Sequence, residues 1–93
     1  MIYAFAQLNV TNPETMAEYR AVAGEALARH GGKVESASSD VIALDGTPEL
    51  PPVAALLSFP DKQSALEWMN DPDLKDVHAL RRSAGTSDIL LMA

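Results

Sequence analysis

Two histidines and one arginine are the side chains of this sequence best suited to transferring a proton or holding an anion. Histidine changes its charge near neutral pH, so a general base is first sought at His30 or His78. His30 comes where a helical pattern ends, and we expect its imidazole to bond to the last carbonyl groups of that helix. For His78 two interpretations stay open, a satisfied structural histidine and a catalytic base.

Arg81 lies on an apolar stripe of a predicted helix. Its guanidinium keeps its charge and needs an acceptor in such a place. The acceptor is either the carboxylate of a ligand, held by two parallel hydrogen bonds, or an internal group such as Asp45, Asp88 or a carbonyl at a helix end. Arg82 falls on the solvent side of the same helix. Arg81 is therefore the charged residue through which a ligand would be held.

Gln7 and Asn9 share one side of an alternating segment with Tyr3 and Phe5. Polar groups inside a protein must find hydrogen bonds. These two amides either orient a small ligand or lie in water and pair with backbone. They count as ligand-binding candidates beside Arg81.

Trp68 and Tyr19 have the spacing of core residues on helices, and large aromatics there usually pack rather than bind. We keep both as ligand-lining candidates. Metal binding is not expected, because neither histidine has a second one four residues on and the aspartates at 71, 73 and 76 lack the glycine and glutamate of a calcium loop. No phosphate-binding or dinucleotide motif occurs, so no cofactor is expected.

The composition limits the partners of the chain. Its 93 residues carry 7 basic and 13 acidic side chains, a net charge of −6, which disfavours binding to nucleic acid or to an anionic membrane. There is no cysteine, no apolar segment of membrane-spanning length and no secretory leader pattern, so we expect a cytoplasmic protein. The length suits one domain, residues 1–93.

Hydrophobic periodicity and turn residues give the order of elements. The pattern predicts strands at 1–10, 53–59 and 88–92, a broken strand region at 34–37 and 41–44, a proline-rich loop at 46–52, a helix at 13–30, and a second helix that begins at Asp61 and is interrupted at 70–72. The order strand, helix, strand, strand, helix, strand is that of the ferredoxin-like α+β fold, with a four-stranded antiparallel sheet and helices on one face.

Two helices can cover only one face of such a sheet. The other face would carry Tyr3, Phe5 and one side of the apolar run Val53–Phe59. Soluble proteins avoid an exposed apolar patch of that size. We therefore predict a homodimer in which two sheets pack face to face.

The chain resembles the domain of unknown function 1330 family, within the dimeric α/β-barrel superfamily, over nearly its whole length. The segments that carry the resemblance follow one another in order: Val10-Thr11-Asn12-Pro13-Glu14, Tyr19, His30-Gly31-Gly32, Leu44-Asp45-Gly46, Ser58-Phe59-Pro60, Ala65 with Trp68, Asp71-Pro72 and Leu80-Arg81-Arg82. The resemblance implies a dimeric barrel whose interior, in related families, binds small organic molecules. Ser58 stands where family members often have an acidic residue, and this position makes it a further ligand-binding candidate.

Two functions follow from these observations. In one, a small organic molecule binds in the dimeric barrel, at Gln7, Asn9, Tyr19, Ser58, Trp68 and Arg81, with cofactor-independent acid–base chemistry open at His78 and Arg81. In the other, the protein is a non-catalytic accessory or interaction module with a filled barrel interior. The sequence leaves open whether the protein is an enzyme.

Overall fold

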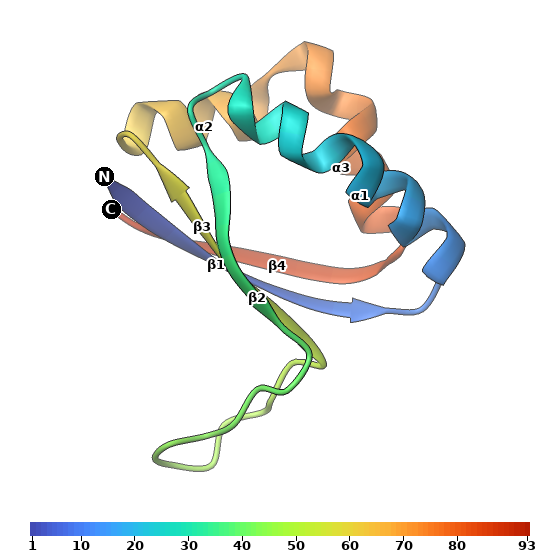
Figure 1. Ribbon diagram of the computed structural model, residues 1–93, viewed down its shortest axis with the longest axis vertical. Coiled ribbons are helices and arrows are strands. Elements are labelled where there is room, and N and C mark those ends of the chain that lie inside the picture. Colours follow the sequence, from blue (N-terminus) through green and yellow to red (C-terminus); the bar gives the residue numbers. More distant parts are fainter.

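The computed structural model describes all 93 residues and has the expected alternation of strands and helices (Figure 1). The elements are β1 (Ile2–Val10), α1 (Pro13–Ala28), β2 (Lys33–Ser38), β3 (Val53–Phe59), α2 (Lys62–Asn70), the short 3₁₀ helix η1 (Pro72–Leu74), α3 (Lys75–Ser83) and β4 (Gly85–Met92). No helix is both long enough and apolar enough to cross a membrane.

The four strands form one antiparallel sheet in the order β2-β3-β1-β4, with the helices on one of its faces (Figure 1). This confirms the ferredoxin-like α+β fold. The apolar segment Val53–Phe59 forms the inner strand β3, which pairs with β1 on one edge and with β2 on the other. The expected central position of this strand is confirmed. A bulge between Val34 and Ser36 shifts the register of β2 on β3 and turns Glu35 toward the face without helices.

Local signals set the helix ends. The side chain of Asn12 accepts the backbone N–H of Thr15 at 3.2 Å, and that of Asp61 accepts the N–H of Ser64 at 2.8 Å, so both helices begin on capping side chains as expected. Helix α1 ends at Ala28, two residues before the predicted end, and Gly31 follows with a φ of 73° that favours glycine.

The core lies between the helices and the sheet. Phe59 and Trp68 are its large aromatics, with ring centroids 5.5 Å apart, and Leu27 of α1 is buried beside them. The strand residues under the helices include small ones, Ala4, Ala6 and Ala55, beside larger ones such as Leu57 and Phe59. Small side chains let the helices approach the sheet closely.

Two boundaries differ from the sequence prediction. Val41–Leu44 is not a strand: residues 39–52 have no helix or strand and project from the ends of β2 and β3, away from the helices (Figure 1). Three prolines in this loop cannot donate ladder hydrogen bonds, and the chain offers no strand beside it. Strand β4 begins at Gly85 rather than Asp88, because Thr86 pairs with Asn9 and extends the ladder with β1.

The two faces of the sheet carry different side chains. We call the side under the helices the helix-side face and the other the open face. The open face bears three alternating sets: Tyr3, Phe5, Gln7 and Asn9 on β1; Ala54, Leu56 and Ser58 on β3; Thr86, Asp88, Leu90 and Met92 on β4. Leu90 and Met92 are 60% and 68% exposed, so within one chain this face is uncovered.

Candidate functional site

A cavity of about 350 Å³ lies between α1 and the helix-side face, and we call it the helix-side cavity. Most of its lining is apolar and comes from α1 and from β1, β2, β3 and β4. The lining residues are Ala6, Leu8, Tyr19, Arg20, Ala23, Gly24, Leu27, Val34, Ala37, Val53, Ala55, Leu57, Arg81 and Ile89. Mostly apolar walls with a few polar groups are typical of small-molecule sites.

Arg81 is the buried cation of this cavity, with only 3% of its surface exposed. Its Nε donates to Ser87 Oγ at 3.1 Å and its Nη1 donates to His78 Nδ1 at 2.8 Å. Its guanidinium carbon lies 5.5 Å from the ring centroid of Trp68 and 5.7 Å from that of Tyr19. Aromatic faces and neutral acceptors hold the group without neutralising its charge.

Arg81 has no carboxylate partner. The internal partners considered from the sequence, Asp45, Asp88 and helix-end carbonyls, are not its acceptors; neutral Ser87 and His78 take that place. The ion pairs of the chain involve Arg29, His30 and Lys33. A buried cation without an opposite charge is costly, so an anion bound beside Arg81 would lower that cost.

His78 is buried and bonded at both ring nitrogens. Its Nδ1 accepts from Arg81, so the proton lies on Nε2, which donates to the carbonyl oxygen of Trp68 at 2.9 Å. Burial lowers the pKa of His78, the positive charges of Arg81 and Arg82 lower it further, and the Trp68 carbonyl opposes them. A neutral imidazole with no free nitrogen positions Arg81 and has no lone pair to offer a substrate.

The aromatic candidates divide between core and cavity. Trp68 is 3% exposed and packs edge-on against His78, with centroids 4.8 Å apart, so it supports the arginine from behind. Its Nε1 is buried without a hydrogen-bond partner. Tyr19 is half-buried and lines the helix-side cavity itself.

Gln7 and Asn9 lie on the opposite face of the sheet from Arg81. Together with Thr86 and Asp88 they line a polar pocket of about 210 Å³ at the end of the open face, closed on one side by residues 49–52 of the projecting loop. One chain therefore does not bring the two amides to the ligand site of Arg81. The six ligand-binding candidates fall into two groups, one on each face.

Ser58 belongs to the open face. It is 1% exposed, and its hydroxyl donates to Glu35 Oε1 at 2.7 Å, while Lys33 Nζ lies 3.4 Å from the same oxygen. The hydrogen bond from Ser58 is the main cause that lowers the pKa of Glu35. The β2 bulge thus brings a carboxylate against Ser58.

His30 does not cap its helix through the imidazole, contrary to the sequence prediction. Its Nε2 lies 2.8 Å from Asp71 Oδ2, and Arg29 Nε lies 3.2 Å from the same oxygen. The hydrogen bond from His30 is the main cause that lowers the pKa of Asp71. The reason is geometric: η1 begins next to the end of α1, and Asp71 offers a stronger acceptor than a carbonyl. The cluster joins two helix ends and is structural.

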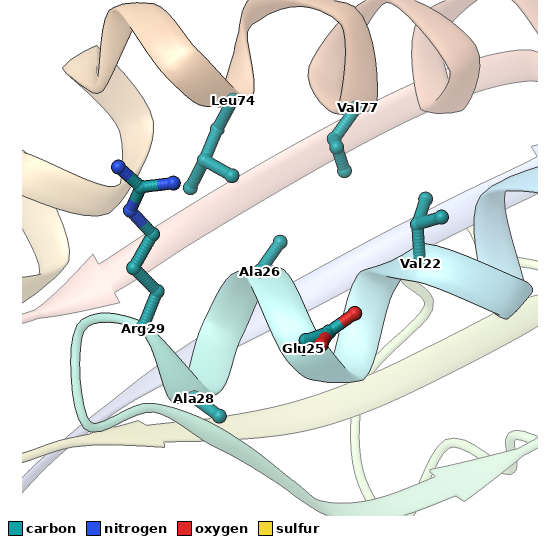
Figure 2. Close-up of a pocket in the computed structure, with 7 residues that line it drawn as sticks. All are labelled: Val22, Glu25, Ala26, Ala28, Arg29, Leu74 and Val77. Atoms are coloured by element: carbon teal, nitrogen blue, oxygen red, sulfur yellow. The ribbon is translucent and has the colours of Figure 1, made fainter.

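A larger groove, of about 750 Å³, lies between α1 and the segment formed by η1 and α3 (Figure 2). Leu74 and Val77 point from η1 and α3 toward α1, where Val22 and Ala26 point back. Its arginine, Arg29, already pairs with Asp71 and with Asp73, the latter at 2.6 Å. This groove is a seam between helices and lacks a free cation.

Sequence reasoning missed two residues of the site. Ser87 lies six residues after Arg81, across the turn into β4, and a hydroxyl there gives no sequence signal. Arg20 also lines the cavity. It directly follows the candidate Tyr19 on α1, and this position could have identified it from the sequence.

The strand order and the helices on one face place the chain among ferredoxin-like α+β proteins. The family model "Domain of unknown function (DUF1330)" matches residues 1–93, so the chain belongs to this family. Among solved structures, the RPA0582 protein of unknown function from Rhodopseudomonas palustris superposes with a TM-score of 0.76 at 19% identity, over 98% of this chain and 79% of that one.

Methylated RPA0582 gives a TM-score of 0.74 at 19% identity, over 98% of this chain and 78% of that chain. At this identity the likeness concerns the fold. A search among curated proteins finds no match.

Proposed function

We propose that this protein binds a small organic molecule in the helix-side cavity. The observation that carries the proposal is an apolar cavity of about 350 Å³ with one buried guanidinium at its wall. Such concave, mostly apolar sites with few polar groups are the usual form of small-molecule sites. Of the six ligand-binding candidates from the sequence, Arg81 and Tyr19 line this cavity, and Trp68 packs beside Arg81.

Binding is favoured over acid–base catalysis. Both ring nitrogens of His78 are engaged, and the cavity lining contains neither a histidine nor a carboxylate. A general base must reach the proton it removes. His78 is better suited to hold Arg81 in place.

We also propose that the protein works as a cytoplasmic homodimer joined through its open faces. Leu90, Met92, Tyr3 and Phe5 form an apolar surface there, and only 16 of the 93 residues are buried within one chain. A second sheet would cover this surface and enclose Gln7 and Asn9 in the barrel. The alternative, an accessory module with a filled interior, needs the same dimer but no ligand.

Filling the cavity tests the binding proposal. A Cβ at Gly24 would have no other heavy atom within 4 Å, so the side chain of Gly24→Leu starts in open space at the cavity wall. Replacing a helical glycine should leave the fold as stable or more stable. The matched control is Ala21→Leu, on exposed helix surface outside the lining.

The readout is a thermal-shift screen of small organic acids, alcohols and amines on the three proteins. We expect hits on the parent and on Ala21→Leu that disappear in Gly24→Leu. Hits that persist in Gly24→Leu would place the ligand elsewhere, and no hits on any protein would favour the accessory module.

A further inference from the structure

The charges around the helix-side cavity oppose those of the whole chain. Two of the seven basic residues, Arg81 and Arg20, line it, and none of the thirteen acidic residues does. Neither arginine forms an ion pair within the chain. In a protein of net charge −6, this cavity is a local site of positive potential.

The guanidinium of Arg81 also keeps unused hydrogen-bonding capacity. Of its five N–H groups, Nε and one on Nη1 donate to Ser87 and His78, and the two on Nη2 have no acceptor in the chain. Trp68 Nε1 is the one side-chain polar atom that is fully buried without a hydrogen-bond partner. Arg81 Nη2 also lacks a partner but is not fully buried. The Nη2 edge of the guanidinium is therefore not fully enclosed, and Arg81 lines the cavity.

His78 fixes this arrangement. Its Nε2–H is held by the Trp68 carbonyl, so its Nδ1 can only accept, and it accepts from Nη1. Ser87 holds Nε on the other side of the guanidinium. The guanidinium of Arg81 is therefore oriented before a ligand arrives, which reduces the entropy lost on binding.

We infer that the ligand is an organic acid with one carboxylate, which binds the Nη2 edge of Arg81, and a slender apolar body, which lies between α1 and the sheet. The inference rests on the proposed function, since it names the ligand class of the same cavity. Arg20, the other cation of the lining, is exposed, so a second charge carried deep into the cavity would meet apolar walls such as Leu27 and Ala55 and would be rejected.

The size of the cavity sets the length of the acid. At about 30 Å³ for each water-sized group, 350 Å³ holds roughly twelve non-hydrogen atoms. Octanoate has about ten, so it stays within this limit, and it carries one charge at neutral pH. Its matched probes are 1-octanol, which is neutral, octylammonium, which is cationic, and suberate, which carries a second carboxylate at the far end.

Calorimetric titration of the parent protein with these four probes at pH 7.5 gives the first arm of the test. We expect octanoate to bind at least ~10-fold more tightly than each of the other three, because a charged hydrogen bond is lost or a charge is buried in each. Equal binding of octanoate and octanol would overturn the inference and leave the proposed function intact. No binding of any probe would contradict both.

Arg81→Met gives the second arm, because methionine fills similar space without charge. We expect this variant to lose octanoate binding by ~10-fold or more, to retain octanol binding, and to melt no lower than the parent without ligand. Arg82→Met, on the exposed side of α3, should bind like the parent. Unchanged octanoate affinity in Arg81→Met would overturn the inference. The four-probe comparison decides it if Arg81→Met does not fold.

Discussion

The two faces of this sheet are built from the same strands but are suited to different partners. On the helix-side face the middle of β1 carries two small residues, Ala4 and Ala6, and a cavity lies between α1 and the sheet. On the open face β1 carries Tyr3 and Phe5, which stand beside Leu90 and Met92 and have no cover within one chain. The alternation of side chains along one strand thus places a cavity on one face and an uncovered apolar surface on the other.

Charge separates the two faces in the same way. The helix-side cavity holds Arg81 and Arg20 without an acid, whereas the open face holds Glu35 and Asp88. An anion is attracted to the first and repelled from the second. The comparison therefore supports the proposal that a ligand binds at one face and a second chain at the other.

The largest expected effect concerns two phenylalanines. Phe59→Ala removes a core side chain that is 1% exposed and should lower the free energy of unfolding by about 3–5 kcal/mol. Phe5→Ala, at 37% exposure, should lower it by less than about 1 kcal/mol when urea unfolding is measured at low protein concentration. Equal losses would mean that a single chain buries both faces alike.

The second effect concerns the dimer. Leu90→Lys places a charge in the middle of the open face and should weaken the dimer by roughly 100-fold, about 3 kcal/mol. Leu66→Lys changes an exposed leucine on α2 and should leave the dimer intact. Sedimentation velocity measures both. A parent protein that stays monomeric at tens of micromolar, or a dimer that survives Leu90→Lys, would contradict the assignment of the open face.

The third effect is a pH dependence of stability that belongs to the helix-side face. The pKa of His78 is lower in the folded state than in the unfolded chain, where it is about 6.5. At pH values between these two pKa values the unfolded chain binds more protons than the folded one. Stability from neutral His78 is complete above pH 6.5 and is lost as the pH falls below it. Asp71, whose pKa is lowered from 3.8, contributes only at more acidic pH.

Thermal melts of the parent and of His78→Gln from pH 8 to pH 5 separate these contributions. The parent should lose stability below pH 6.5, and His78→Gln should lose less over the same range because glutamine does not titrate. Parallel curves for the two proteins would show that His78 is not held neutral by burial.

The smallest effect comes from two serines, one on each face. Ser58→Ala removes the hydroxyl that donates to Glu35, and Ser87→Ala removes the acceptor of Arg81 Nε. Each should cost about 1 kcal/mol of unfolding free energy. Only Ser87→Ala should weaken octanoate binding in calorimetry. A similar loss of affinity in Ser58→Ala would show that residues of both faces contribute to one binding site.

The fold could be predicted from the sequence because each element carries local signals. Asn12 and Asp61 cap helices, Gly31 ends one, and the alternation along Ile2–Val10 defines a strand with two faces. The same alternation already placed Gln7 and Ala6 on different faces of the strand. The separation of the amides from Arg81 was therefore present in the sequence, although the shared site was not excluded there.

The partners of the polar side chains could not be predicted, since they depend on tertiary contacts. His30 meets Asp71, 41 residues away, because η1 lies at the end of α1. Glu35 meets Ser58 only because a bulge turns it to the open face. For Arg81 the sequence left both a ligand and an internal acid open, and the structure gives it neutral neighbours instead.

The most direct test of the division between the faces is an NMR titration of the labelled protein with octanoate. We predict that the Arg81 Nε–H signal and the methyl signals of Leu27 and Ala55, all at the helix-side cavity, shift with saturation. The methyl signals of Leu90 and Ala54, on the open face, should stay in place. Shifts at Leu90 and Ala54 with an unmoved Arg81 would place the ligand on the other face and contradict the account.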